Sequence, residues 1–156
     1  MNVLFETGQA GAVATTHDWL TPPEILQALG PFDLDPCASL YQPWRTATKQ
    51  YTIEDDGLKK EWRGRVWCNP PYSRGNINKF IDKALYEAKE NGVRSVFLVR
   101  FDPTAKWFQK AFKSGYCDIY MLDKRIKFKG ADNTYPLSNC FIHFQAKDNK
   151  GGVYYI

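Results

Sequence analysis

Eight consecutive residues, Val66-Trp67-Cys68-Asn69-Pro70-Pro71-Tyr72-Ser73, decide how the rest of the chain is interpreted. The first three are typical of a short buried strand, and the two prolines prevent a helix or a strand from continuing past Asn69. A helical pattern then begins at Ile77, after a Gly75-Asn76 break. The stretch therefore predicts a strand, a stiff loop and a helix. In an open α/β sheet such a loop lies at the carboxyl edge, where ligands bind.

The loop carries groups that can hold a planar amine. Asn69 supplies an amide, Pro70 and Pro71 supply carbonyls without neighbouring N–H donors, and Tyr72 supplies an aromatic ring. The alternative is a proline turn with a buried tyrosine, which any globular protein can contain. We favour the functional interpretation because an Asn-Pro-Pro-aromatic run arises by chance only about once in 10⁵ positions at average residue usage.

Length and composition indicate a single globular domain. The chain has 156 residues, of which 44% are hydrophobic and 15% aromatic, enough for a sizeable packed core. The formal net charge of +4 permits an electrostatic contribution to nucleic-acid binding without requiring one. Composition therefore excludes a disordered chain and leaves the partner open.

The four cysteines do not have the spacing of a metal site. Cys37, Cys68, Cys117 and Cys140 form no Cys-x-x-Cys pair, and each lies in or beside an apolar run. We predict four buried, reduced thiols and no metal, which favours a cytoplasmic protein. The sequence shows no signal peptide and no apolar run as long as a membrane span, so we expect no membrane association.

The pattern along the chain predicts one α/β domain over residues 19–156, preceded by a flexible arm over residues 1–18. Helices are expected from an N-cap at Thr21, from Ile77, and from Asp102-Pro103. Short strands are expected at residues 32–35, 66–69, 95–99, 117–122, 126–128, 140–144 and 153–155. This order predicts a compact sheet whose C-terminal strands are antiparallel.

Several motifs, taken in this order, resemble those of a known family. They are Trp19-Leu20-Thr21-Pro22-Pro23, Asp33-Leu34-Asp35-Pro36-Cys37-Ala38, the Asn69 loop, Lys106-Trp107-Phe108 and Arg125-Ile126-Lys127-Phe128. Over residues 19–145 the chain resembles the phage-type DNA N-6-adenine methyltransferases, which use S-adenosylmethionine. The resemblance implies an abbreviated Rossmann-like methyltransferase sheet and site-specific methylation of the exocyclic amine of adenine in double-stranded DNA.

The resemblance assigns the catalytic residues to the Asn69 loop. The side-chain oxygen of Asn69 and the carbonyl of Pro70 are expected to accept the two hydrogens of the adenine amine. Pro70 and Pro71 stiffen the loop, and Tyr72 is expected to stack on a base flipped out of the duplex. No strong general base is needed, because the amine loses its proton after the methyl group has been transferred.

The resemblance also implies a cofactor site and a DNA-binding surface. For S-adenosylmethionine we expect Thr21 and Pro22 near the methionine end, Asp35 on the ammonium group, and Asp55 or Asp56 on the adenine or ribose. The full set of predicted cofactor residues is Trp19, Thr21, Pro22, Asp35, Pro36, Cys37, Asp55 and Asp56. The predicted DNA contacts are Ser73, Arg74, Arg100, Arg125, Lys127 and Phe128, with Phe128 near the flipped base.

Each of these assignments has a structural alternative. Thr21 can be only an N-cap, and Asp35 only a loop carboxylate. Residues 125–128 can be only a strand with a solvated basic face. The chain also lacks the Gly-x-Gly turn that is usual after the first strand of Rossmann-type methyltransferases, since Pro36-Cys37-Ala38-Ser39 contains no glycine.

The stretch between Asp35 and Asn69 is short for this fold. A complete β-α-β crossover takes about 30 residues, so two β-α units do not fit between them. Either the sheet lacks a strand, or Asp35 belongs to the second strand and the cofactor loop lies elsewhere. Target specificity must then come from short loops such as 40–52 or 129–139, or from a second subunit.

Other functions stay open at this stage, as does the oligomeric state. One alternative is methylation of cytosine or of another planar amine, which the same loop can accommodate. Another is a catalytically idle DNA-binding module of the same fold. If the phage-type resemblance holds, the protein is expected in the cytoplasm of a bacterial host cell.

Overall fold

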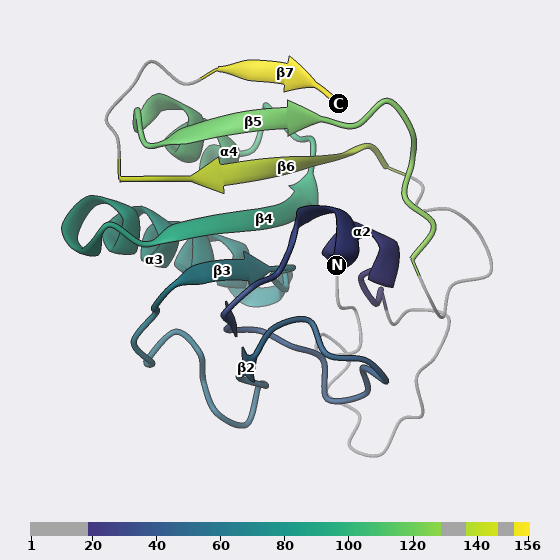
Figure 1. The fold of residues 1–156 in the computed structure, drawn as a ribbon. Coiled ribbons are helices and arrows are strands. Elements are labelled where there is room, and N and C mark those ends of the chain that lie inside the picture. Colours follow the sequence, from purple (N-terminus) through teal and green to yellow (C-terminus); the bar gives the residue numbers. More distant parts are fainter. Residues whose placement is uncertain (1–18, 129–136, 147–151) are drawn as a thin grey trace.

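A seven-stranded mixed sheet forms the centre of the molecule (Figure 1). The computed structural model describes residues 19–128, 137–146 and 152–156, and the arm expected at residues 1–18 lies outside them. The strands are β1 Leu34–Asp35, β2 Lys49–Gln50, β3 Arg65–Cys68, β4 Arg94–Arg100, β5 Cys117–Met121, β6 Asn139–Phe144 and β7 Val153–Tyr155. The helices are α2 Pro23–Leu29, the 3-10 turn η1 Ser73–Gly75, α3 Asn76–Asn91 and α4 Lys106–Lys113.

The sheet has a parallel half and a largely antiparallel half. Its strand order is β2-β1-β3-β4-β6-β5-β7. Strands β2, β1, β3 and β4 are parallel, whereas β6 runs antiparallel to both β4 and β5. At the edge, β7 pairs with β5 in the parallel sense. The predicted α/β class is therefore confirmed, with antiparallel pairing among the C-terminal strands.

Both faces of the sheet are buried, and the strands alternate between two cores. Val66 and Cys68 of β3 pack in the same cluster as Phe80 of α3 and Trp107 of α4. Trp67, between them, points to the other cluster, which the apolar residues of α2 cover. This period of two is the expected consequence of successive side chains pointing to opposite faces. Helices α3 and α4 cover one face, and α2 covers part of the other (Figure 1).

Helix α3 follows the sequence pattern closely. Its buried residues include Ile77, Phe80, Ile81, Ala84 and Ala88, which recur at helical spacing. It ends at Gly92, whose φ of 67° places the C-cap in the left-handed region that glycine favours. The helix thus supports the loop that follows β3, since Tyr72 of that loop packs against the cluster that contains Ile77 and Phe80 of α3.

Three local predictions are wrong. Thr21 is not an N-cap, because Pro22 holds that position without a side-chain hydrogen bond. Helix α4 begins at Lys106, and residues 102–105 form a turn in which the Ala105 N–H donates to the carbonyl of Asp102 at 3.1 Å. Residues 126–128 form no strand, although Ile126 and Phe128 are buried.

The short stretch between Asp35 and Asn69 is accommodated without helices. Asp35 ends β1, which pairs with both β2 and β3, so it belongs to a central strand of the parallel half. Residues 36–64 contain β2 and several turns, and all of them are described. The spacing predicted that two β-α units do not fit, and the structure confirms that the connections here are loops.

Candidate active site at the carboxyl ends of β1, β3 and β4

Three parallel strands end at one edge of the sheet and bring the predicted motifs together. Asp35 ends β1, Asn69 follows β3, and Arg100 ends β4. The register fixes their relative heights, since Leu34 pairs with Val66 and Cys68 pairs with Phe97. The motifs at Asp35 and Asn69, which are 34 positions apart in sequence, are therefore neighbours in space, as the contact of Cys37 with the backbone of Asn69 also shows.

The Asn69 amide is held by the first motif of the chain. Its nitrogen Nδ2 donates to the carbonyl of Trp19 at 3.2 Å and to Oγ1 of Thr21 at 3.4 Å. A carbonyl only accepts hydrogen bonds, so the group that faces Trp19 must be the NH₂ end of the amide. This contact fixes the orientation of the side chain and leaves Oδ1 as its acceptor atom. Asn69 is 5% exposed, so both contacts are sheltered from water.

A pair of thiols joins the loops after β1 and β3. Sγ of Cys37 donates to the backbone carbonyl of Asn69 at 3.3 Å and lies 3.2 Å from Sγ of Cys68. Burial raises the pKa of both thiols, which keeps them protonated at neutral pH. All four cysteines are free and buried, as the sequence predicted. The backbone of Asn69 is thus tied to the loop that follows Asp35.

Both carboxylate oxygens of Asp35 accept hydrogen bonds from other residues of the protein. Its Oδ1 accepts from the Cys37 N–H at 3.0 Å, and its Oδ2 accepts from Oγ1 of Thr46 at 2.5 Å. Burial raises the pKa of this carboxyl from 3.8 to about 6, against the two hydrogen bonds, which lower it. These contacts pin the loop between β1 and β2, and Asp35 is not among the residues that line the cavity described next.

A cavity of about 290 Å³ lies beside the Asn69 loop. It is lined by Pro36, Cys37, Thr52, Ile53, Asp56, Gly57, Leu58, Pro71, Asn76 and Phe80. Of the predicted acidic pair, Asp56 lines this cavity. Asp55 is exposed, and its Oδ2 instead accepts from the Thr52 N–H at 2.8 Å. The cavity is apolar with one carboxylate at its wall, and its size suits a ligand fragment such as a nucleoside.

Gly57 is a site residue that sequence reasoning missed. A Cβ built on Gly57 lies 1.9 Å from the carbonyl oxygen of Pro36, so any side chain there collides with backbone. The carbonyl of Gly57 accepts from Nε1 of the buried Trp62 at 3.0 Å, which ties this turn to the core. The only signal in the sequence is a glycine after two acidic residues, which ordinarily marks a turn.

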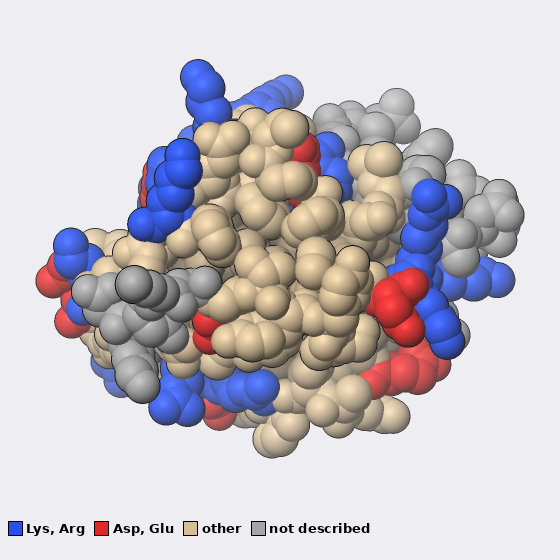
Figure 2. All heavy atoms as spheres, turned by 90° about the horizontal axis from the view of Figure 1, so that it is seen from above, with Lys and Arg blue, Asp and Glu red and all other residues tan. Residues whose placement is uncertain are grey.

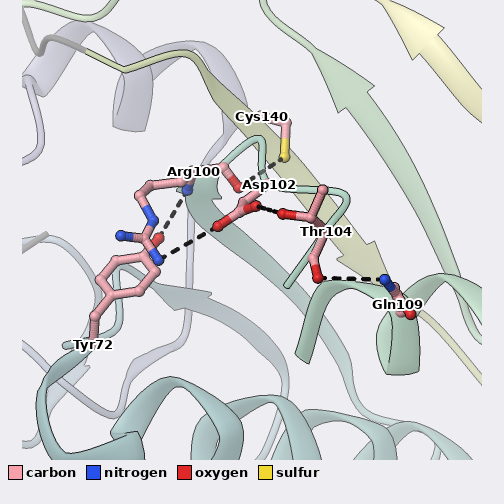
Figure 3. A network of polar contacts seen from close by, with 6 residues as sticks. All are labelled: Tyr72, Arg100, Asp102, Thr104, Gln109 and Cys140. Carbon is pink, nitrogen blue, oxygen red and sulfur yellow. Dashed lines mark hydrogen bonds and ion pairs between the residues drawn. The ribbon is translucent and has the colours of Figure 1, made fainter. Parts of the chain in front are cut away.

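Tyr72 is packed at the side of the site between the core and Arg100 (Figure 3). Its hydroxyl oxygen accepts from the Arg100 N–H at 2.8 Å, and its ring centroid lies 6.0 Å from that of Trp107. The guanidinium carbon of Arg100 lies 4.3 Å from the ring centroid of Tyr72. The Arg100 guanidinium also forms an ion pair of 3.7 Å with Asp102. The ring is therefore fixed in direction by the end of β4.

The predicted DNA-contacting residues differ in exposure. Arg74, Arg125 and Lys127 are exposed, and Ser73 is half-buried. Phe128 is only 1% exposed, and its ring packs edge-to-face on Trp19 at 5.6 Å. This side chain lies in the core, so in this conformation it supports Trp19 and does not face a DNA surface.

The β7 edge of the molecule has a different surface. Figure 2 shows Lys and Arg mainly around the margin of this face, whose middle is formed mostly by uncharged residues. Among the described residues, Tyr154, Tyr155 and Ile156 of this edge are exposed. A phosphate backbone requires cations, so the middle of this face offers little to bind DNA.

The described part of the chain offers neither a metal centre nor a membrane-spanning helix. No group of three or more His, Cys, Asp or Glu residues there is arranged to hold a metal ion. Among the helices described, none has the length and apolar character needed to cross a membrane.

Comparisons with known protein families and with individual proteins point to the same family. The DNA N-6-adenine-methyltransferase (Dam) family matches residues 11–150. A DNA N-6-adenine-methyltransferase of Haemophilus phage HP1 (strain HP1c1) is 33% identical over 99 residues, which is 62% of this chain and 54% of the relative. A protein of the same name from Escherichia phage T1 is 30% identical over 151 residues, covering 88% of this chain and 61% of the relative. The chain thus matches little more than half the length of these two relatives.

Proposed function

The chain belongs to the DNA N-6-adenine-methyltransferase family, and we propose that it transfers a methyl group from S-adenosylmethionine to the exocyclic amine of adenine in double-stranded DNA. The observation that carries the proposal is the orientation of the Asn69 amide by Trp19 and Thr21. Trp19 and Asn69 lie 50 positions apart in sequence, and their contact identifies Oδ1 as the accepting end of the amide. Pro71 of the same loop lines a cavity of suitable size.

The residues around the cavity fit the adenosine part of the cofactor. When bound, S-adenosylmethionine supplies a methyl group on a positively charged sulfur. Pro36, Leu58 and Phe80 give apolar surface for a purine, and Asp56 offers a carboxylate to ribose hydroxyls or to an amine. Cys37 lines the same cavity and contacts the Asn69 backbone, so the cofactor and the catalytic loop share a wall.

The Asn69 loop supplies the acceptor side of the reaction. The exocyclic amine of adenine is a poor nucleophile because its lone pair is delocalised into the ring. Oδ1 of Asn69 and the carbonyl of Pro70 accept the two amine hydrogens, which draws the nitrogen toward a pyramidal shape and localises its lone pair. The nitrogen forms a bond to the methyl carbon as the bond from that carbon to the cofactor sulfur breaks, and a neutral thioether is left as the second product. The surplus proton of the nitrogen leaves to water. Pro70 and Pro71 keep the loop stiff, so little ordering is lost when the amine binds.

We infer new roles for Thr21 and Asp35, supported by their contacts. Thr21 orients Asn69, in place of the predicted contact with the methionine end of the cofactor. Asp35 holds the loop between β1 and β2 through Cys37 and Thr46, and Asp56 takes over as the carboxylate that faces the cofactor. Both reassignments are part of the proposal.

The substrate side requires base flipping. The amine of a paired adenine is not accessible to the loop within a duplex, so the base must leave the stack. Tyr72 offers its ring to the flipped base, and the exposed Arg74, Arg125 and Lys127 neutralise backbone phosphates. The two relatives are phage proteins, so we place this activity in the cytoplasm of a bacterial host.

Identification of the methylated nucleoside tests the proposal. Bacterial chromosomal DNA that lacks methyladenine is incubated with the protein and cofactor labelled on its methyl group, then digested to nucleosides and separated. We expect the label in N6-methyladenine. Label in methylcytosine instead identifies the alternative acceptor. No label in DNA, with no binding of cofactor in calorimetry, identifies an idle module of the same fold.

A further inference from the structure

Arg100 occupies one face of the Tyr72 ring, the ring that the proposed function assigns to the flipped base (Figure 3). The guanidinium carbon lies 4.3 Å from the ring centroid, a distance typical of a cation–π contact. The backbone N–H of the same residue donates to the Tyr72 hydroxyl at 2.8 Å. One residue therefore both anchors the hydroxyl of Tyr72 and covers its ring.

Tyr72 is half-buried, so part of this residue is accessible from solvent. On the core side, Tyr72 packs against the cluster that contains Trp107, which is 5% exposed and lies 6.0 Å from the tyrosine ring. The side chain of Arg100 is 28% exposed. The guanidinium already occupies this face of the ring, so a base that stacks on the same face of Tyr72 has to take its place.

The contacts that hold Arg100 in this position are weak. Its Nη2 pairs with Oδ2 of Asp102 at 3.7 Å, and the Asp102 side chain is 35% exposed, so water and salt screen the pair. Oδ1 of Asp102 accepts from Oγ1 of Thr104 at 2.9 Å, which fixes the carboxylate to the turn before α4. Within the described part of the chain, Nε of Arg100 is buried without a hydrogen-bond partner, which disfavours the covered state.

We propose that Arg100 is a gate on the base-stacking face of Tyr72, which Asp102 holds closed and an unpaired base displaces. The guanidinium and a purine are both flat and both bind the face of an aromatic ring, so they compete for the same surface. This inference rests on the proposed function in one respect only, which is that the displacing base is the flipped adenine. Displacement of Arg100 is then a positioning step that precedes methyl transfer.

The test separates base stacking from phosphate binding. The probes are a single-stranded oligo(dA) of about twelve nucleotides and an abasic oligomer of equal length, which has the same phosphates and no bases. The quantity measured is the ratio of the Kd for the abasic oligomer to the Kd for oligo(dA). Tyr72→Ala is expected to bring this ratio close to one.

Opening the gate is expected to raise the ratio. Arg100→Ala removes the competitor, and we expect the ratio to rise about three-fold. Asp102→Asn frees Arg100 without removing it and is expected to raise the ratio in the same direction. It also serves as the second variant if Arg100→Ala does not fold.

Two controls match the charge changes. Arg125→Ala removes an exposed cation that does not contact Tyr72, so it should weaken both oligomers equally. Asp82→Asn breaks the exposed 2.7 Å ion pair between Asp82 and Lys110 and should leave the ratio unchanged. A ratio that stays constant or falls in both Arg100→Ala and Asp102→Asn overturns the gate. A ratio that rises in a protein that transfers no methyl group supports the gate and contradicts only the proposed function.

Discussion

The two sides of the site are built in different ways. On one side, Asn69 follows β3 and Arg100 ends β4. These two strands pair over four consecutive positions, and α3 packs against β4. On the other side, β1 and β2 have two residues each, and residues 36–64 contain no helix. The first side is positioned by regular secondary structure, and the second by individual contacts.

This difference separates the expected effects of substitutions. The regular side holds the groups proposed to act on the adenine amine, and its strands survive the loss of one side chain. The loop side forms much of the cavity proposed for the cofactor, and its shape depends on a few interactions such as those of Asp35 with Thr46 and of Gly57 with Pro36. Variants on the regular side should therefore impair transfer, and variants on the loop side should impair stability or cofactor binding.

Asn69→Ala should have the largest effect, because it removes the side-chain acceptor of the adenine amine. By analogy with the loss of one preorganised hydrogen-bonding group in an active site, we expect the transfer rate to fall about 100- to 1,000-fold. The measurement is single-turnover transfer of labelled methyl to DNA. Asn78→Ala on α3, outside the contacts described for the site, is the matched amide control, and a full rate in Asn69→Ala contradicts the mechanism.

Asp35→Asn should change how stability depends on pH. The folded-state pKa of Asp35 is about 6 against an ordinary value of 3.8, so the wild type loses stability as the pH rises through this interval. The asparagine does not titrate. The unfolding free energy of the variant minus that of the wild type should therefore rise by about 2 kcal/mol between pH 4 and pH 7.

Denaturant unfolding of both proteins at several pH values measures this difference. The other carboxylates contribute equally to both proteins, so their contributions cancel in the difference. A difference that is flat with pH, or that worsens for the variant as the pH rises, shows that the Asp35 carboxylate is not held in a desolvated site.

Gly57→Ala should push the loop that contains residue 57 away from the backbone of Pro36. The added Cβ cannot fit 1.9 Å from a backbone oxygen, so the loop must move and the cavity must change shape. Overpacking of this kind costs roughly 1–3 kcal/mol, and we expect cofactor affinity to fall about ten-fold or more. Gly75→Ala is unsuitable as a control because its φ is 73°, so the comparison is with Ser73→Ala, which adds no atoms.

Thr21→Val should have the smallest effect. It preserves the shape of the side chain but removes the Oγ1 acceptor of the Asn69 amide, and the contact with the Trp19 carbonyl remains. Loss of one such bond is worth about 1 kcal/mol, so we expect about a five-fold slower transfer at saturating cofactor. An unchanged transfer rate combined with weaker cofactor binding would contradict this role and support the original prediction that Thr21 contacts the cofactor.

The regular side was predictable from sequence because its signals are local or periodic. Strand β4 is a continuous apolar run, α3 has helical spacing, and the two prolines end β3 where the structure ends it. The carboxyl-edge position of Asn69 follows from these elements alone. The antiparallel pairing of the C-terminal strands was likewise predictable from the β-rich tail.

The remaining features depend on contacts between distant residues. Thr21 has the local chemistry of an N-cap, but its hydroxyl accepts from an amide 48 positions away. Asp55 and Asp56 are equivalent as sequence, and only the turn made by Asp55 with Thr52 decides which one faces the cavity. Phe128 alternates with charged residues as a surface strand does, yet its ring completes the packing around Trp19.

Calorimetric titration of the wild type, Asn69→Ala and Gly57→Ala with S-adenosylmethionine tests most directly the proposed division of the site between two sides. We predict one saturable site in the wild type, a similar Kd in Asn69→Ala and a Kd at least about ten-fold higher in Gly57→Ala. No binding to the wild type, or loss of binding in Asn69→Ala with full binding in Gly57→Ala, would contradict the account.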